Sequence, residues 1–139
     1  KIVRKDILGK ANVKIVKLTW IDEDAQEADV EFEFEGNIYH AFGCPVSFIE
    51  NEKYEVELFC IEDLDVNIDF MLKENTEKQK ILKPKSNSKW SYYAFGQVVA
   101  VNPLSVDCGV TIFDLERNFR DERLINEYIY FVIERLDIM

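Results

Sequence analysis

The chain has 139 residues, 47% of them hydrophobic and 13% aromatic, which is enough for one domain with a substantial core and excludes a disordered chain. Asp and Glu number 27 against 17 Lys and Arg, a formal charge of −10. A field of this sign repels nucleic acids and anionic membranes and attracts basic partners. Composition therefore counts against a nucleic-acid partner and against a membrane.

Alternation of apolar and polar residues predicts strands along most of the chain. The predicted strands cover 14–20, 28–35, 38–42, 52–60, 63–70, 90–101, 106–112 and 127–137. The interval 73–89 has six lysines and no such period, so we expect an exposed loop between two halves of a single β domain, 1–139. About eight strands and at most one short helix predict an all-β fold, either a single antiparallel β-barrel or a sandwich. We favour the barrel, because 90–101 and 127–137 are long and apolar on both faces.

The strand 90–101 is rich in aromatic residues on both faces. We expect Phe95, Val99 and Val101 to belong to the core, and Trp90 to lie near the rim beside the lysine-rich loop. Gly96 falls where a long strand would coil from one sheet to the other.

Eight acids and no basic residue lie between Asp22 and Glu35. Five of them alternate with apolar residues, so they project from one face of a strand about 6.8 Å apart: Glu27, Asp29, Glu31, Glu33 and Glu35. The other three form the turn Asp22, Glu23 and Asp24. Two interpretations stay open, a surface for a basic partner or cation and a solubilising face that protects a strand edge.

No motif in the sequence indicates catalysis. His40 is the single histidine, and Cys44 follows it across a Gly-Cys-Pro break that leaves their geometry open. Phosphate-binding loops, dinucleotide-binding loops and nucleophile elbows are missing from the sequence. We therefore expect a protein that is not an enzyme, with no cofactor and no metal site.

The three cysteines, Cys44, Cys60 and Cys108, favour reduced thiols, since secreted scaffolds usually carry an even set. No run reaches the roughly 18 apolar residues of a membrane helix. We expect a cytoplasmic protein.

Strand patterning at 94–104 (AFGQVVAVNPL), 106–110 (VDCGV) and 126–138 (NEYIYFVIERLDI) resembles small acidic bacterial OB-like β-barrel proteins, some of which are immunity proteins of polymorphic or contact-dependent toxin systems. The resemblance covers the last third of the chain. It implies an OB-like barrel and tight binding of a cognate toxin, and it carries over no individual site residue.

Charge and resemblance together predict a cytosolic immunity protein that neutralises a basic, nuclease-type toxin domain by occluding it. The contact surface would comprise the eight acids from Asp22 to Glu35. The alternative is a single-stranded nucleic-acid-binding protein of the OB type, in which Trp90 and Tyr92 stack on bases and Lys85 and Lys89 hold the backbone. Lysines gathered in one interval favour this alternative, and the net charge opposes it.

Overall fold

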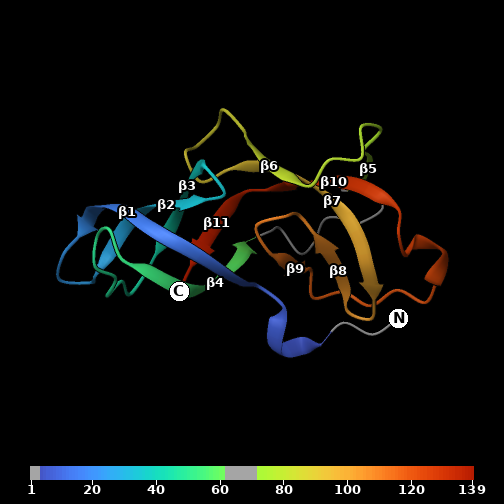
Figure 1. Ribbon diagram of the computed structural model, residues 1–139, viewed down its shortest axis with the longest axis horizontal. Helices are drawn as coiled ribbons and strands as arrows, with labels where there is room; N and C mark the ends of the chain where they lie inside the picture. Colours follow the sequence, from blue (N-terminus) through green and yellow to red (C-terminus); the bar gives the residue numbers. More distant parts are fainter. Residues whose placement is uncertain (1–3, 62–71) are drawn as a thin grey trace.

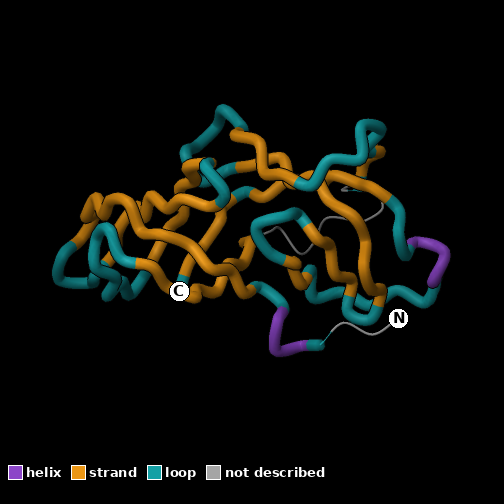
Figure 2. Tube along the Cα trace, viewed as in Figure 1, coloured by secondary structure: helices purple, strands orange, loops and turns teal. Residues whose placement is uncertain are grey.

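The chain folds into a closed barrel and a second sheet beside it (Figure 1). The computed structural model describes residues 4–61 and 72–139. The barrel strands are β1 (Lys10–Asp22), β2 (Glu27–Phe34), β3 (Asn37–Gly43), β4 (Lys53–Ile61) and β11 (Arg135–Ile138). The second sheet holds β5 (Lys73–Glu74), β6 (Ile81–Pro84), β7 (Tyr92–Val101), β8 (Leu104–Asp107), β9 (Ile112–Asp114) and β10 (Tyr128–Ile133). Helical structure in the described chain is limited to two short 3-10 helices, η1 (Lys5–Ile7) and η2 (Glu122–Leu124), as Figure 2 shows.

The barrel follows the strand order β1-β2-β3-β11-β4 and closes through the pairing of β1 with β4. All neighbours are antiparallel except β3 and β11, which are parallel. A five-stranded barrel of this kind is OB-like, so the predicted fold class is confirmed. The parallel pair was not predicted, since alternation along a strand carries no information on the direction of its neighbour.

Strand period explains which residues fill the barrel. In β2 the apolar members of the alternation, Ala28, Val30 and Phe32, are fully buried inside. Buried residues of the second sheet, such as Phe131 and Val98, belong to the same hydrophobic cluster. The two sheets therefore share one core.

The second sheet is inserted between β4 and β11 in the chain. The segment 127–137, predicted as one strand, is two strands: β10 lies in the second sheet and β11 in the barrel, with Glu134 between them. The chain passes from one sheet to the other at this residue and not at Gly96.

Gly96 marks a change of neighbour within the second sheet. Residues before it in β7 pair with β6, and residues after it pair with β8. A side chain at Gly96 would collide with the carbonyl oxygen of Asp107, so glycine permits the close approach of β8. Of the three residues predicted to be core, Val101 is buried, whereas Phe95 and Val99 are half-buried. The core prediction is wrong for these two.

The interval 73–89 is not a loop throughout, because it contains β5 and β6. Leu82 of β6 is buried and Asn75 is held by hydrogen bonds to Gln79 and Ile129. Both strands are too short to show a period. The predicted strand 63–70 lies outside the described residues. No helix in the described ranges has the length and hydrophobicity needed to cross a bilayer.

Candidate functional site

The predicted acidic strand face is only partly exposed. Glu33 and Glu35 are exposed and Glu27 and Glu31 are half-buried, but Asp29 is buried, with 2% of its surface accessible. The prediction that all five acids project into solvent is therefore wrong for Asp29. The turn acids, Asp22, Glu23 and Asp24, are exposed as expected.

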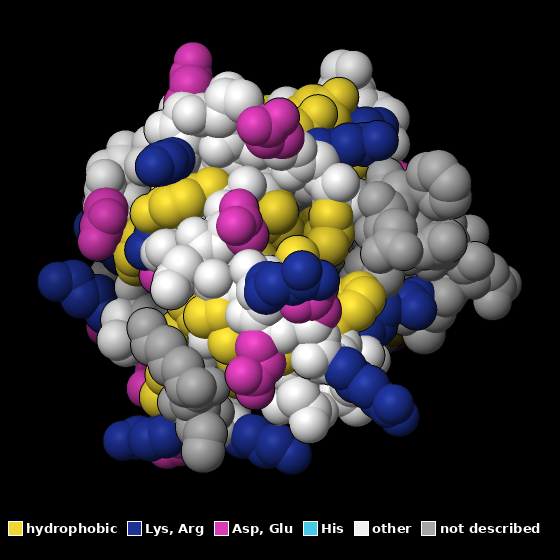
Figure 3. Space-filling model, turned by 90° about the vertical axis from the view of Figure 1, so that its right-hand side faces the viewer, with side chains coloured by type: hydrophobic (Ala, Val, Ile, Leu, Met, Phe, Trp, Pro, Cys, Tyr) yellow, Lys and Arg dark blue, Asp and Glu magenta, His cyan; other side chains and the backbone are white. Residues whose placement is uncertain are grey.

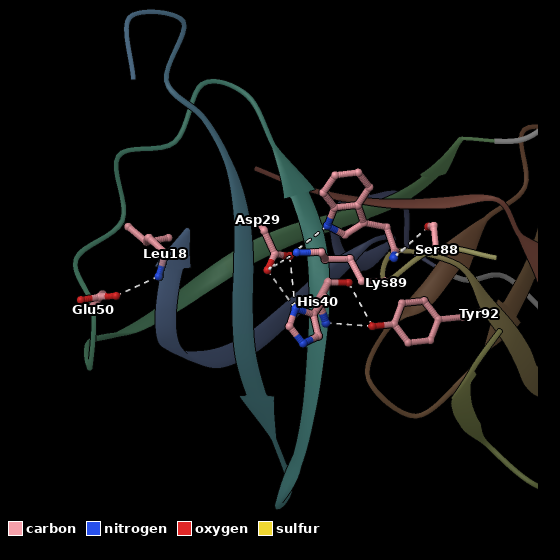
Figure 4. Close-up of polar contacts among 8 residues, drawn as sticks. Leu18, Asp29, His40, Glu50, Ser88, Lys89 and Tyr92 are labelled. Carbon is pink, nitrogen blue, oxygen red and sulfur yellow. Dashed lines mark hydrogen bonds and ion pairs between the residues drawn. The ribbon is translucent and has the colours of Figure 1, made fainter. Parts of the chain in front are cut away.

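Asp29 is covered by residues that precede β7 (Figure 4). Its carboxylate accepts a hydrogen bond from the indole Nε1 of Trp90 at 2.9 Å and lies 3.0 Å from Nδ1 of His40 on β3. The Nζ of Lys89 lies 3.6 Å away. A carboxylate surrounded by three donors of this kind can stay ionised although it is buried.

An aromatic layer continues this cover across β3 and β11. Phe42 is the cross-strand neighbour of both Asp29 and Asp137. Its ring packs edge-on against Trp90 with 5.4 Å between centroids, and the guanidinium of Arg135 lies 4.4 Å from its centroid. Arg135 in turn pairs with Asp137 at 2.7 Å. Two buried acids thus occupy the outer barrel surface because aromatic and cationic side chains cover them.

Tyr92 joins the second sheet to the barrel. Its hydroxyl accepts a hydrogen bond from the backbone N–H of His40 at 2.8 Å and donates one to the carbonyl of His40 at 3.0 Å. The described pairing of β3 with β11 begins only at Phe42, so the hydroxyl satisfies backbone groups that a neighbouring strand would otherwise pair. Burial raises the pKa of Tyr92 from 10.0 to about 12.

These contacts bear on the alternative nucleic-acid site. Tyr92 is buried and presents no ring face to solvent, so it cannot stack on a base. Trp90 is half-buried against Phe42, Lys89 pairs with Asp29, and Lys85 bonds to Asn87. The structure brings Lys89, Trp90 and Tyr92 together, but it uses them to attach the second sheet to the barrel.

Asp29, Glu31 and His40 form the one group in the described part of the chain whose ligand atoms lie close enough, within 4.8 Å, to hold a metal ion. Such an ion would have to displace Lys89 and the hydrogen bond between Asp29 and His40. The strand alternation could not reveal this group, since it depends on the pairing of Glu31 with His40.

The remaining acids form a continuous surface that we call the acidic face. It comprises Asp22, Glu23, Asp24, Glu27, Glu31, Glu33 and Glu35. None of these seven carboxylates lies within 4.0 Å of a cationic group among the described residues. Lys17 and Lys14 of β1 are cross-strand neighbours of Glu31 and Glu33, which partly neutralises that end.

Apolar side chains lie beside the acidic face and were not predicted as part of a site. Trp20 and Ile21, directly before the acidic turn, are 42% and 52% exposed. At the other end of the face, Glu33 and Phe34 line an open hollow of about 590 Å³ with Tyr54. The exposed Trp20 could have been suspected from its position next to the turn, where the barrel strand ends.

Comparison with protein families, with curated proteins and with solved structures yields no match to this chain.

Proposed function

We propose that the chain is a non-enzymatic binding protein whose partner is a basic protein domain and which binds that partner through the acidic face. OB-like barrels bind ligands on the face of their second and third strands and on the loop between the first and second. In this barrel those positions carry the seven unpaired acids. This coincidence of ligand face and unpaired negative charge is the observation that carries the proposal.

Binding would proceed in two steps. The acids steer a cationic partner toward the face, which raises the association rate at low salt. Trp20 and Ile21 then lose their exposure to water, and large aromatic side chains are the residues that dominate binding energy at interfaces. A steering surface beside an apolar anchor is what the proposal requires.

Within this class, we propose an immunity protein that occupies the active cleft of a nuclease-type toxin, since such toxins must be basic to hold their nucleic-acid substrate. The resemblance in 94–110 and 126–138 supports this assignment, as does the formal charge of −10. The proposed location is the cytoplasm, where the thiols of Cys44 and Cys108 would stay reduced.

The test uses two double variants of equal charge. Glu23→Lys with Asp24→Lys reverses the acidic turn, and Glu122→Lys with Glu127→Lys makes the same change of charge at exposed positions near η2. Figure 3 shows that acidic, basic and hydrophobic side chains are interspersed on that end of the molecule. Each immobilised protein is used to capture proteins from its native cells, and the captured proteins are identified by mass spectrometry.

The proposal expects a basic protein that the wild type and the η2 variant retain and the acidic-turn variant loses. Its association rate with purified wild type should fall steeply as salt is added. Retention by both variants, or an association rate indifferent to salt, would show that the acidic face is not the contact surface.

A further inference from the structure

The outer face of the second sheet carries aromatic rings and lysines side by side. Strand register places Tyr130 of β10 opposite Phe95 of β7 and Lys73 of β5, and Tyr93 opposite Lys83 of β6. Cross-strand neighbours project from the same face of a sheet. With Tyr128 and Lys78 these residues form what we call the aromatic–lysine face.

The rings of this face are held in place by the packing beneath them. Alternate residues of the same strands, including Tyr92, Ala94 and Phe131, are buried on the opposite side. On the outer side Phe95 stacks on Tyr130 with 4.8 Å between ring centroids, and Tyr93 meets Tyr130 edge-on at 6.3 Å. Tyr93 is 37% exposed, and Phe95, Tyr128 and Tyr130 are partly exposed. A ligand would therefore find the rings already oriented, with little entropy left to lose.

The lysines of the face are not neutralised by acids. The Nζ of Lys83 lies 4.9 Å from the centroid of Phe95, and that of Lys78 lies 6.0 Å from the centroid of Tyr128. Neither lysine, nor Lys73, has an ion-pair partner within 4.0 Å among the described residues. In a chain of charge −10 these cations are segregated on the surface that also presents the rings.

We propose that the aromatic–lysine face binds single-stranded nucleic acid. Unpaired bases stack on Tyr93, Phe95 and Tyr130, and backbone phosphates lie against the lysines at the margin of the rings. Planar rings on one face of a sheet with cations around them are the arrangement by which sheets hold single strands without reading their sequence. The partner is selected by two properties together, since neither an anion alone nor an apolar surface alone uses both the rings and the lysines.

This surface is separate from the acidic face, which belongs to the barrel and not to the second sheet. The two proposals therefore fail independently. Reversing Glu23 and Asp24 to Lys removes the proposed protein contact and is expected to leave oligonucleotide binding intact or slightly stronger, because less negative charge then repels the strand.

The experiment measures binding of fluorescent oligothymidylate and oligouridylate of about 15 nucleotides, a length that covers a single site of this type, by anisotropy at increasing salt. Tyr93→Leu and Phe95→Leu remove a flat ring and keep an apolar side chain. Trp20→Leu, at an exposed aromatic on the barrel, is the matched control. Unfolding midpoints confirm that each variant is folded.

We expect each ring variant to weaken binding by about 5- to 100-fold, as the loss of one stacked base does, and the Trp20 control to bind like wild type. Lys83→Gln should reduce the slope of log affinity against log salt by about 0.7, the value for one lost phosphate contact on a single strand. Lys53→Gln, an exposed lysine on β4, should leave that slope unchanged.

Four results would overturn the proposal. Wild type could fail to bind either oligonucleotide at low salt, or it could bind a duplex of the same length as tightly, in which case stacking is not involved. Equal affinity for labelled poly-glutamate would reduce the face to a general anion site. Self-association that Tyr93→Leu abolishes, without oligonucleotide binding, would assign the face to a second copy of the chain.

Discussion

At the scale of single residues, Asp29 shows how an outward-facing strand residue becomes buried. Alternation in β2 correctly assigns its side chain to the outside of the barrel, where Glu31 and Glu33 also lie. Trp90, 61 residues further along the chain, then covers it and donates a hydrogen bond to it. The carboxylate is thus a fixed point at which the segment before β7 attaches to the barrel.

Asp29→Ala should lower the free energy of unfolding by about 2–3 kcal/mol, because Trp90 Nε1 loses its acceptor and His40 and Lys89 lose their counter-charge. The measurement is urea denaturation in a Trp20→Phe background, which leaves Trp90 as the one tryptophan. Emission of the folded variant should shift to the red as the indole becomes hydrated.

Glu33→Ala provides the control, since Glu33 lies on the same strand and projects outward but is exposed. Its effect should stay within about 0.5 kcal/mol. Equal losses for the two variants would mean that the contacts of Asp29 contribute nothing to stability.

At the scale of elements, Tyr92 is where the first residue of β7 meets the edge of β3. Removing its hydroxyl by Tyr92→Phe leaves the N–H and carbonyl of His40 unsatisfied, at a cost of about 1–3 kcal/mol at neutral pH. Because burial raises the pKa of this hydroxyl from 10.0 to about 12, the folded state favours the protonated phenol. The corresponding stability is present below pH 10.0 and disappears as the pH rises to about 12.

Wild type should therefore lose roughly 2 kcal/mol more than Tyr92→Phe over that interval, measured by denaturant unfolding at a series of alkaline pH values. Tyr39, whose pKa burial also raises, is present in both proteins and cancels in the difference. Parallel pH profiles for the two proteins would show that the Tyr92 phenol is not the titrating group.

Elements also show what local sequence can predict. Period-two alternation located β1 to β4 and the all-β class, because each of these strands is long enough to expose one face and bury the other. It could not divide 127–137 at Glu134, since residues on both sides of the division continue to alternate. It also missed β6, which has only four residues.

The candidate sites were predictable to the same degree. The exposed acids follow from a local pattern, and the sequence identified them. The burial of Asp29 and the capping of β3 by Tyr92 depend on contacts 61 and 52 residues apart, and no local pattern records them. The aromatic–lysine face required the register of β6 and β5 against β7 and β10, which places lysines from the interval 73–89 beside the rings.

At the scale of the whole molecule, the charge of −10 is distributed unevenly. The acidic face holds seven carboxylates without ion pairs in the described structure, whereas lysines surround the rings of the second sheet. Near η2 acids lie beside arginines, and Asp121 pairs with Arg123 at 2.9 Å. Repulsion is therefore concentrated at the acidic face, and the cost of the net charge to stability should be located there.

Added sodium chloride should accordingly stabilise the protein. As the screening length falls from about 10 Å at 0.1 M to about 3 Å at 1 M, repulsion within the acidic face is reduced, and the melting temperature should rise by about 2–5 °C. Reversing Glu23 and Asp24 to Lys changes the formal charge from −10 to −6, since each substitution adds two charges, and it should abolish most of this rise. Reversing Glu122 and Glu127 gives the same charge of −6 but removes acids near Arg123, so the rise should persist. Calorimetry of the three proteins at both salt concentrations measures the difference, and an equal response of the two variants would show that net charge, and not its concentration on the acidic face, determines the effect of salt.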